Sequence, residues 1–257
     1  NESRLLVPVL REGGKPVAVA WDEVLMTTAM RFREAADKHG PGAVAVIASP
    51  LSSNEELFLV KKLAAEVLST ENVGFTSRVP GDGISDDFLI KADKNPNAKG
   101  AQLLGFAEDG FDRAVKAISD GKVRALLLFG NVLSGFSDGE VEALLSKVPF
   151  VAQVGTGDGA VSRAAHAVLP SASFVERGGT FTNFAGRVQR FRRGFAPRGK
   201  ARNDIEILVG LANRMGADWK FDGEESVFRA LAADSAPFSG MSYESLGSGG
   251  QAVAGVR

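Results

Sequence analysis

The sequence predicts an α/β fold in which a mostly parallel, doubly wound sheet carries helices on both faces. The first observation is three apolar runs without polar alternation, at residues 43–48, 123–129 and 150–154. A strand that reads this way is buried on both faces, as parallel strands in α/β sheets are. The second observation is that helical patterns alternate with these runs, which is the order that strand–helix–strand units produce.

Two short apolar strands are expected first, at 5–10 and 16–20, split by a turn at 12–15. Asp22 is the expected N-cap of the first helix, because its carboxylate can accept free N–H groups. The further expected elements are a helix to about 37, strand 43–48, helix 55–68 with Asn54 as N-cap, helix 110–120, strand 123–129, helix 139–147, strand 150–154, helix 161–165, strand 167–169, helix 204–215 and helix 223–233.

We assign residues 1–234 to a single domain. Within it, 78–110 is polar and turn-rich, and we expect a shortened, irregular insert there. Residues 235–257 hold five glycines and five serines, a composition that predicts a flexible tail. The chain starts at Asn1 without a methionine, so we expect a processed chain or a fragment of a longer protein.

The composition excludes several classes of site. Lys and Arg number 30 against 31 Asp and Glu, and a net charge of -1 argues against nucleic acid as the main partner. Cysteine is absent, which excludes disulfides, iron–sulfur ligation, thiolate zinc sites and a cysteine nucleophile within this chain. No apolar run reaches about 18 residues, so no membrane insertion is expected.

Residues 174–191 (FVERGGTFTNFAGRVQRF) are the densest candidate for chemistry. From residue 177 to 202 the chain contains eight basic residues and no acidic one: Arg177, Arg187, Arg190, Arg192, Arg193, Arg198, Lys200 and Arg202. One interpretation is an anion site for a pyrophosphate or an acidic partner. The other is a solvated loop with some salt bridges, which composition alone favours.

Glycines also follow two of the expected strands, at 130–135 and 155–159. Loops at the carboxyl ends of parallel strands are where α/β folds bind ligands. Neither segment matches GxGxxG or a Walker loop, so ordinary turn glycines are favoured over a nucleotide site.

Several segments together carry a family resemblance: Asn54-Glu55-Glu56, Leu89–Asn97, Ala167–Pro170, Gly179–Asn183 and Gly186–Gln189. They resemble the molybdopterin-oxidoreductase-like domain of the large G subunit of NADH-quinone oxidoreductase, respiratory complex I. The similarity covers about residues 4–216. It implies the α/β domain of the formate dehydrogenase and DMSO reductase group, with the second cofactor lobe largely missing because only about 40 residues stand in its place.

The resemblance also indicates what is lost. In the formate dehydrogenase pattern, the residue that holds the metal follows an Asn-Val…Arg-Val stretch, and here that position falls on Pro80. Proline has no side-chain donor atom, so we expect no metal ligand there. The remnant of a cofactor loop would be Gly179, Thr180, Asn183, Gly186 and Arg187, with no cofactor expected on it.

The function that the resemblance implies is therefore structural. This chain would be a cofactor-free domain of the G subunit, supporting electron transfer from NADH to quinone through iron–sulfur clusters in a preceding part of the subunit. Its partners would be other subunits of a bacterial complex I, in the cytoplasm and peripheral to the inner membrane through the complex. Because cations without acidic neighbours suit an acidic partner, we expect contacts at Arg187, Arg190, Arg192, Arg193 and Arg198.

Two alternatives stay open. The first is a fragment of a catalytic molybdopterin oxidoreductase that binds a bis-guanine-dinucleotide cofactor, such as a formate dehydrogenase. The second is a nucleotide-binding module, which rests only on the glycine loops after the strands.

Overall fold

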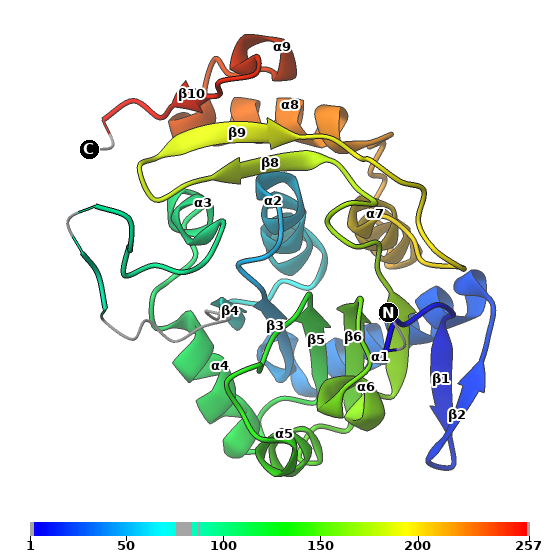
Figure 1. Ribbon diagram of the computed structural model, residues 1–257. Helices are drawn as coiled ribbons and strands as arrows, with labels where there is room; N and C mark the ends of the chain where they lie inside the picture. Colours follow the sequence, from blue (N-terminus) through cyan, green and yellow to red (C-terminus); the bar gives the residue numbers. More distant parts are fainter. Residues whose placement is uncertain (1–2, 76–83, 87, 256–257) are drawn as a thin grey trace.

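A seven-stranded sheet forms the centre of the computed structural model, which describes residues 3–75, 84–86 and 88–255. The strand order is β2-β1-β7-β6-β5-β3-β4, and the five strands from β7 to β4 are parallel (Figure 1). The strands are β1 (Val9–Glu12), β2 (Lys15–Ala18), β3 (Val44–Ala48), β4 (Val73–Phe75), β5 (Ala125–Phe129), β6 (Phe150–Gly155) and β7 (Ala167–Pro170). The predicted fold class is confirmed, and the antiparallel β1–β2 hairpin completes one edge.

Helices cover both faces of this sheet. They are α1 (Trp21–His39), α2 (Asn54–Lys62), α3 (Ala98–Leu103), α4 (Gly110–Ser119), α5 (Asp138–Leu145), α6 (Ala160–Ala164), α7 (Asp204–Arg214), α8 (Glu224–Asp234) and α9 (Tyr243–Leu246). Short helical turns lie at Pro41–Ala43, Leu63–Val67 and Ala236–Phe238. No helix in the described ranges is both long and apolar enough to cross a membrane.

Strand β3 shows why its sequence is apolar throughout. Val44, Val46 and Ala48 join the core that contains α1, α2 and α7. Ala45 and Ile47 face the opposite side and join the core of α4, α5 and α6. Because successive side chains of a strand alternate between faces, a strand between two helical layers must be apolar at every position.

A second, three-stranded antiparallel sheet was not predicted. It has the order β10-β9-β8 and consists of β8 (Gly179–Thr182), β9 (Arg187–Phe191) and β10 (Gln251–Ala252). In Figure 1, α2, α3 and α7 lie between this sheet and the central one. The interpretation of 177–202 as a solvated loop is therefore wrong for 179–182 and 187–191, where pairing between β8 and β9 outweighs the polar composition.

The expectation of a flexible tail at 235–257 is wrong for the described residues to 255. This segment contains α9 and β10, and β10 pairs with β9. Five of its side chains are buried in the core: Phe238, Met241, Tyr243, Leu246 and Val253. Burying these apolar side chains lowers the free energy of the folded segment, and this gain outweighs the flexibility that its glycines and serines favour. In the expected irregular insert, residues 98–103 form α3, while 84–86 and 88–97 contain no helix or strand.

Candidate functional site

The start of α2 is polar and yet completely enclosed. The helix begins where the chain leaves β3, and its N-cap is Ser53, one residue before the predicted Asn54. Ser53 Oγ accepts from the Glu56 N–H at 3.2 Å, and the Glu56 carboxylate accepts from the Ser53 N–H at 2.8 Å. Asn54 and Glu55 are buried with them, so each polar atom needs a partner inside the protein.

The β8 strand supplies those partners. Asn54 Nδ2 donates to the hydroxyl oxygens of Thr180 and Thr182, both at 3.0 Å. The Glu55 carboxylate accepts from the Thr180 N–H at 2.9 Å and the Thr180 hydroxyl at 3.0 Å. It also accepts from the Tyr243 hydroxyl at 2.8 Å, which ties the C-terminal segment to α2.

Next to these bonds, two carboxylates share one buried arginine. Arg177 Nη1 contacts Glu56 Oε1 at 2.6 Å and also donates to Asp204, the first residue of α7. Its Nη2 donates to the Leu51 carbonyl oxygen at 3.1 Å. The Ser171 hydroxyl donates to the other oxygen of Asp204 at 2.5 Å. Asn97 belongs to the same set through its Oδ1, which accepts from the Thr182 N–H at 2.7 Å. We refer to the whole set as the buried polar network: Ser53, Asn54, Glu55, Glu56, Asn97, Ser171, Arg177, Thr180, Thr182, Asp204 and Tyr243.

Burial changes the protonation of this network. It raises the pKa of Glu55 to about 7, against the hydrogen bonds from Thr180 and Tyr243. It raises the pKa of Glu56 to about 8 and also raises that of Asp204, although Arg177 opposes both shifts. Desolvation therefore favours the protonated form of each of these three carboxyl groups, while Arg177 favours the charged form of Glu56 and Asp204. Tuned carboxylates can mark an active site, but Glu55 and Glu56 are wholly buried, and the described partners of the network are protein groups.

Two cavities open at the carboxyl ends of the parallel strands. The smaller one, about 330 Å³, is lined by the loops after β5 and β6, residues 130–134 and 155–159, together with Asp138 and Gln153. The two glycine segments noted in the sequence thus lie side by side. The Gln153 side-chain oxygen is buried there without a hydrogen-bond partner.

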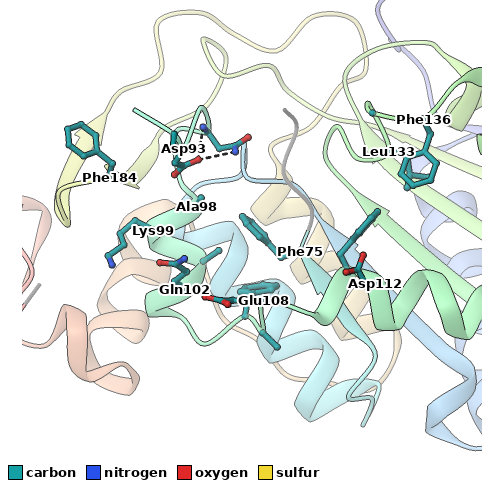
Figure 2. A pocket seen from close by; sticks show the side chains of 17 residues that line it. Phe75, Asp93, Ala98, Lys99, Gln102, Glu108, Asp112, Leu133, Phe136 and Phe184 are labelled. Carbon is teal, nitrogen blue, oxygen red and sulfur yellow. Dashed lines mark hydrogen bonds between the residues drawn. The ribbon is translucent and has the colours of Figure 1, made fainter. Parts of the chain in front are cut away.

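The larger cavity, about 700 Å³, combines five phenylalanines with polar, charged and small side chains (Figure 2). Phe75 of β4, Phe106 of the α3–α4 connection and Phe136 of the loop after β5 line it. Asp93, Lys99, Glu108 and Asp112 supply charged groups, and Phe184 reaches it from the β8–β9 turn. Because four separate segments build this cavity, no single sequence motif could have indicated it.

Comparison with known proteins identifies the family. The profile described as molybdopterin oxidoreductase matches residues 4–90 and 91–214. This chain belongs to the molybdopterin oxidoreductase family. Acetylene hydratase from Pelobacter acetylenicus has the same fold, with a TM-score of 0.68 over 95% of this chain and 65% of that one, at 11% identity.

Relatives with higher identity are much longer proteins. A Staphylococcus haemolyticus protein named "Putative formate dehydrogenase" is 32% identical over 135 residues, which is 51% of this chain and 14% of that protein. One of the same name from Staphylococcus aureus (strain USA300) is 30% identical over 165 residues, 63% of this chain and 16% of that protein. The chain therefore corresponds to a small part of each relative.

The family name implies a pterin cofactor, and the described residues that line the smaller cavity do not fit a phosphate-bearing one. The cavity between the glycine loops is lined by Asp138 and Asp158, and no lysine or arginine lines it in the described chain. Arg163 is engaged with Asp138 at 2.6 Å. A pyrophosphate would therefore meet the Asp158 carboxylate here and no cation among the described lining residues.

The residues of the expected cofactor loop have other roles. Gly179 and Thr180 lie on β8 against α2, and Gly179 has a φ of +154° where a Cβ would lie 2.9 Å from the Ser53 Cβ. Asn183 and Gly186 form the β8–β9 turn, with the Gly186 N–H donating to the Asn183 carbonyl oxygen. Arg187 donates to the carbonyl oxygens of residues 249 and 250 at 3.3 and 2.9 Å. Pro80, the expected metal-ligand position, lies outside the described residues.

The candidate contact arginines divide into two groups. Arg187 and Arg190 serve the second sheet, and the Arg190 guanidinium lies 4.1 Å from the Tyr243 ring centroid. Arg192, Arg193 and Arg198 are exposed. All five were predicted to lie in one contact region. A sequence does not show which arginines contact residues that are distant along the chain, so Arg187 and Arg190 could not be separated from the others.

Sequence reasoning missed the role of Asn97. Its Oδ1 accepts from the Thr182 N–H at 2.7 Å, and its Nδ2 donates to the Ser52 carbonyl oxygen at 2.8 Å. Gly100 makes this possible, since a Cβ there would lie 2.2 Å from Asn97 Oδ1 and 2.1 Å from Asn54 Oδ1. The only signal in the sequence was an asparagine three residues before a glycine.

Proposed function

We propose that this chain is a structural domain of the G subunit of NADH-quinone oxidoreductase, and that it binds no molybdopterin. The observation that carries the proposal is the lining of the cavity between the glycine loops, where Asp138 and Asp158 stand without a lysine or arginine among the described lining residues. The polar side chains of the expected cofactor loop support it, because Thr180 is already paired with Asn54 and Glu55.

In this proposal the domain is a rigid scaffold, and the electrons pass through another part of the subunit. The buried polar network fixes the second sheet on α2, and the exposed surface contacts other subunits. Iron–sulfur clusters in a preceding part of the subunit carry the electrons from NADH towards quinone. The complex lies in the cytoplasm of a bacterium and is peripheral to the inner membrane at this subunit.

Metal and pterin analysis of the full-length protein tests this function. The protein is isolated with its bound partners, its iron, molybdenum and tungsten contents are measured, and pterin is extracted and quantified by fluorescence. We expect stoichiometric iron, with molybdenum, tungsten and pterin far below one per chain. Co-isolation of NADH-oxidising, quinone-reducing activity completes the expected result.

The second candidate is a piece of a catalytic molybdopterin oxidoreductase. It is favoured by the relatives named as formate dehydrogenases at 30 to 32% identity. For this function the full-length protein would contain one molybdenum or tungsten per chain with released pterin, and would reduce a dye with formate. Either finding would overturn the structural proposal.

A further inference from the structure

The cations between residues 177 and 202 belong to two sets. Four are engaged inside the domain: Arg177 in the buried polar network, Arg187 on backbone carbonyl oxygens, Arg190 over Tyr243 and Arg202 over Trp21. The other four are exposed and form no ion pair within the described part of the chain: Arg192, Arg193, Arg198 and Lys200. Because these four side chains form no ion pair within the described residues, their charges are available to bind a partner.

Two large aromatic side chains are exposed beside these arginines. Phe174 and Phe195 are each 69% exposed. The N–H groups of Gly194 and Phe195 both donate to the Val175 carbonyl oxygen, at 2.9 and 3.1 Å, so the two segments are joined where the phenylalanines project. Aromatic and arginine side chains together are the composition of interface hot spots. We call Phe174, Arg192, Arg193, Phe195 and Arg198 the arginine–phenylalanine surface.

Backbone hydrogen bonds hold this surface in place. The Lys200 N–H donates to the Leu6 carbonyl oxygen at 2.7 Å, and the Lys200 carbonyl oxygen accepts from the Trp21 indole N–H at 2.7 Å. In Figure 1 the chain after β9 runs down the right-hand side of the view, from the second sheet towards α1. A loop fixed at both ends loses little conformational entropy on binding, which favours its use as a docking surface.

We propose that the arginine–phenylalanine surface binds an acidic protein segment, with carboxylates placed on Arg192, Arg193 and Arg198 and an apolar side chain placed against Phe174 and Phe195. Guanidinium groups bind carboxylates in a bidentate geometry, and complementary charge gives the contact its orientation. The proposal rests on the proposed function only in placing the partner within the same assembly. A nucleic acid suits the surface less well, because the whole chain has a net charge of -1 and the patch is short.

Site-specific photo-crosslinking of the full-length protein in its host cell tests the proposal. A p-benzoyl-phenylalanine replaces Phe195, the cells are irradiated, and the crosslinked peptide is sequenced by mass spectrometry. We expect a peptide of another protein with net negative charge around the crosslinked residue. The same reporter in place of Met30, which is 57% exposed on α1, is expected to give a different product or none.

Charge reversal identifies the arginines that matter. The variant R192E/R193E/R198E, made with the crosslinker at 195, is expected to lower the yield of that product about tenfold, since like charges repel an acidic segment. The matched control is R113E/K116E, which reverses two exposed cations on α4 and is expected to leave the yield within about twofold. Circular dichroism checks that each variant stays folded.

Three results would overturn the proposal: no product at 195, a product with nucleic acid, or a peptide without acidic residues. A yield that survives the triple reversal would overturn it as well. An acidic peptide from a protein outside NADH-quinone oxidoreductase would support this surface and count against the proposed function, so the two failures are distinguishable.

Discussion

Arginine has opposite roles at the two ends of the basic segment. Arg177 is buried and donates to the carboxyl groups of Glu56 and Asp204, which come from α2 and α7. Arg192 and Arg193 stand in solvent beside exposed phenylalanines. Arginine therefore stabilises the domain at Arg177, which we call the closed end, and is exposed to solvent at Arg192, Arg193 and Arg198, which we call the open end.

This difference shows that the basic composition of 177–202 is not one feature. Removing a charge from the closed end leaves buried carboxylates unpaired, which is costly, whereas removing one from the open end removes only a solvated group. Stability measurements can therefore separate the two ends before any partner is known.

The largest expected effect is at Arg177. The substitution Arg177→Met is expected to lower the free energy of unfolding by about 3–5 kcal/mol, because it leaves Glu56 and Asp204 buried without their cation. Urea denaturation of the chain measures the loss. Arg187→Met is the matched control, since Arg187 is exposed and, within the described ranges, its side chain donates to backbone carbonyl oxygens; its cost is expected to be about 1 kcal/mol.

A compensating variant makes the reason specific. In R177M/E56Q/D204N the carboxylates are removed with the arginine, so much of the lost stability is expected to return. If the triple variant is no more stable than R177M, the cost lies in packing of the arginine side chain, and the ion pair is not what distinguishes the closed end.

Next in size is the pH dependence of Glu55. Its folded-state pKa of about 7 is above the ordinary value of 4.5, so this group favours the folded state below pH 4.5, and that stability is lost as the pH rises through 7. Relative to Glu55→Gln, the wild type is expected to lose about 3 kcal/mol between pH 4.5 and pH 8. Thermal or urea unfolding across this range measures the difference, and parallel curves for the two proteins would refute the burial argument.

A smaller effect is expected where the C-terminal segment meets the network. Tyr243→Phe removes the hydroxyl that donates to Glu55 and keeps the ring, so a loss of about 1–2 kcal/mol is expected. Ser248→Ala, at an exposed position of the same segment, is expected to change stability by less than about 0.5 kcal/mol. Equal costs for the two variants would show that the segment is not anchored through Tyr243.

The sequence predicted the central sheet because the relevant signal is local. Residues 44–48 and 125–129 are apolar at every position, and both form fully buried parallel strands. The second sheet has no such signal, since β9 is stabilised by β8 and by β10, which lies sixty residues further along the chain. The same limit applies to the network: Glu55 and Tyr243 meet only after folding, and nothing near either residue marks the contact.

The smallest stability effect is expected at the open end. The variant R192Q/R193Q/R198Q removes three exposed charges, so the free energy of unfolding is expected to change by less than about 0.5 kcal/mol per residue. Crosslinking from position 195 should nevertheless fall, because the carboxylates of the partner lose their bidentate donors. Urea denaturation and crosslink yield, measured on the same protein, therefore give opposite answers at the two ends: R177M lowers stability, and the glutamine variant lowers binding. A glutamine variant as unstable as R177M would mean that these arginines are also part of the domain's internal structure, and the distinction between a closed and an open end would fail.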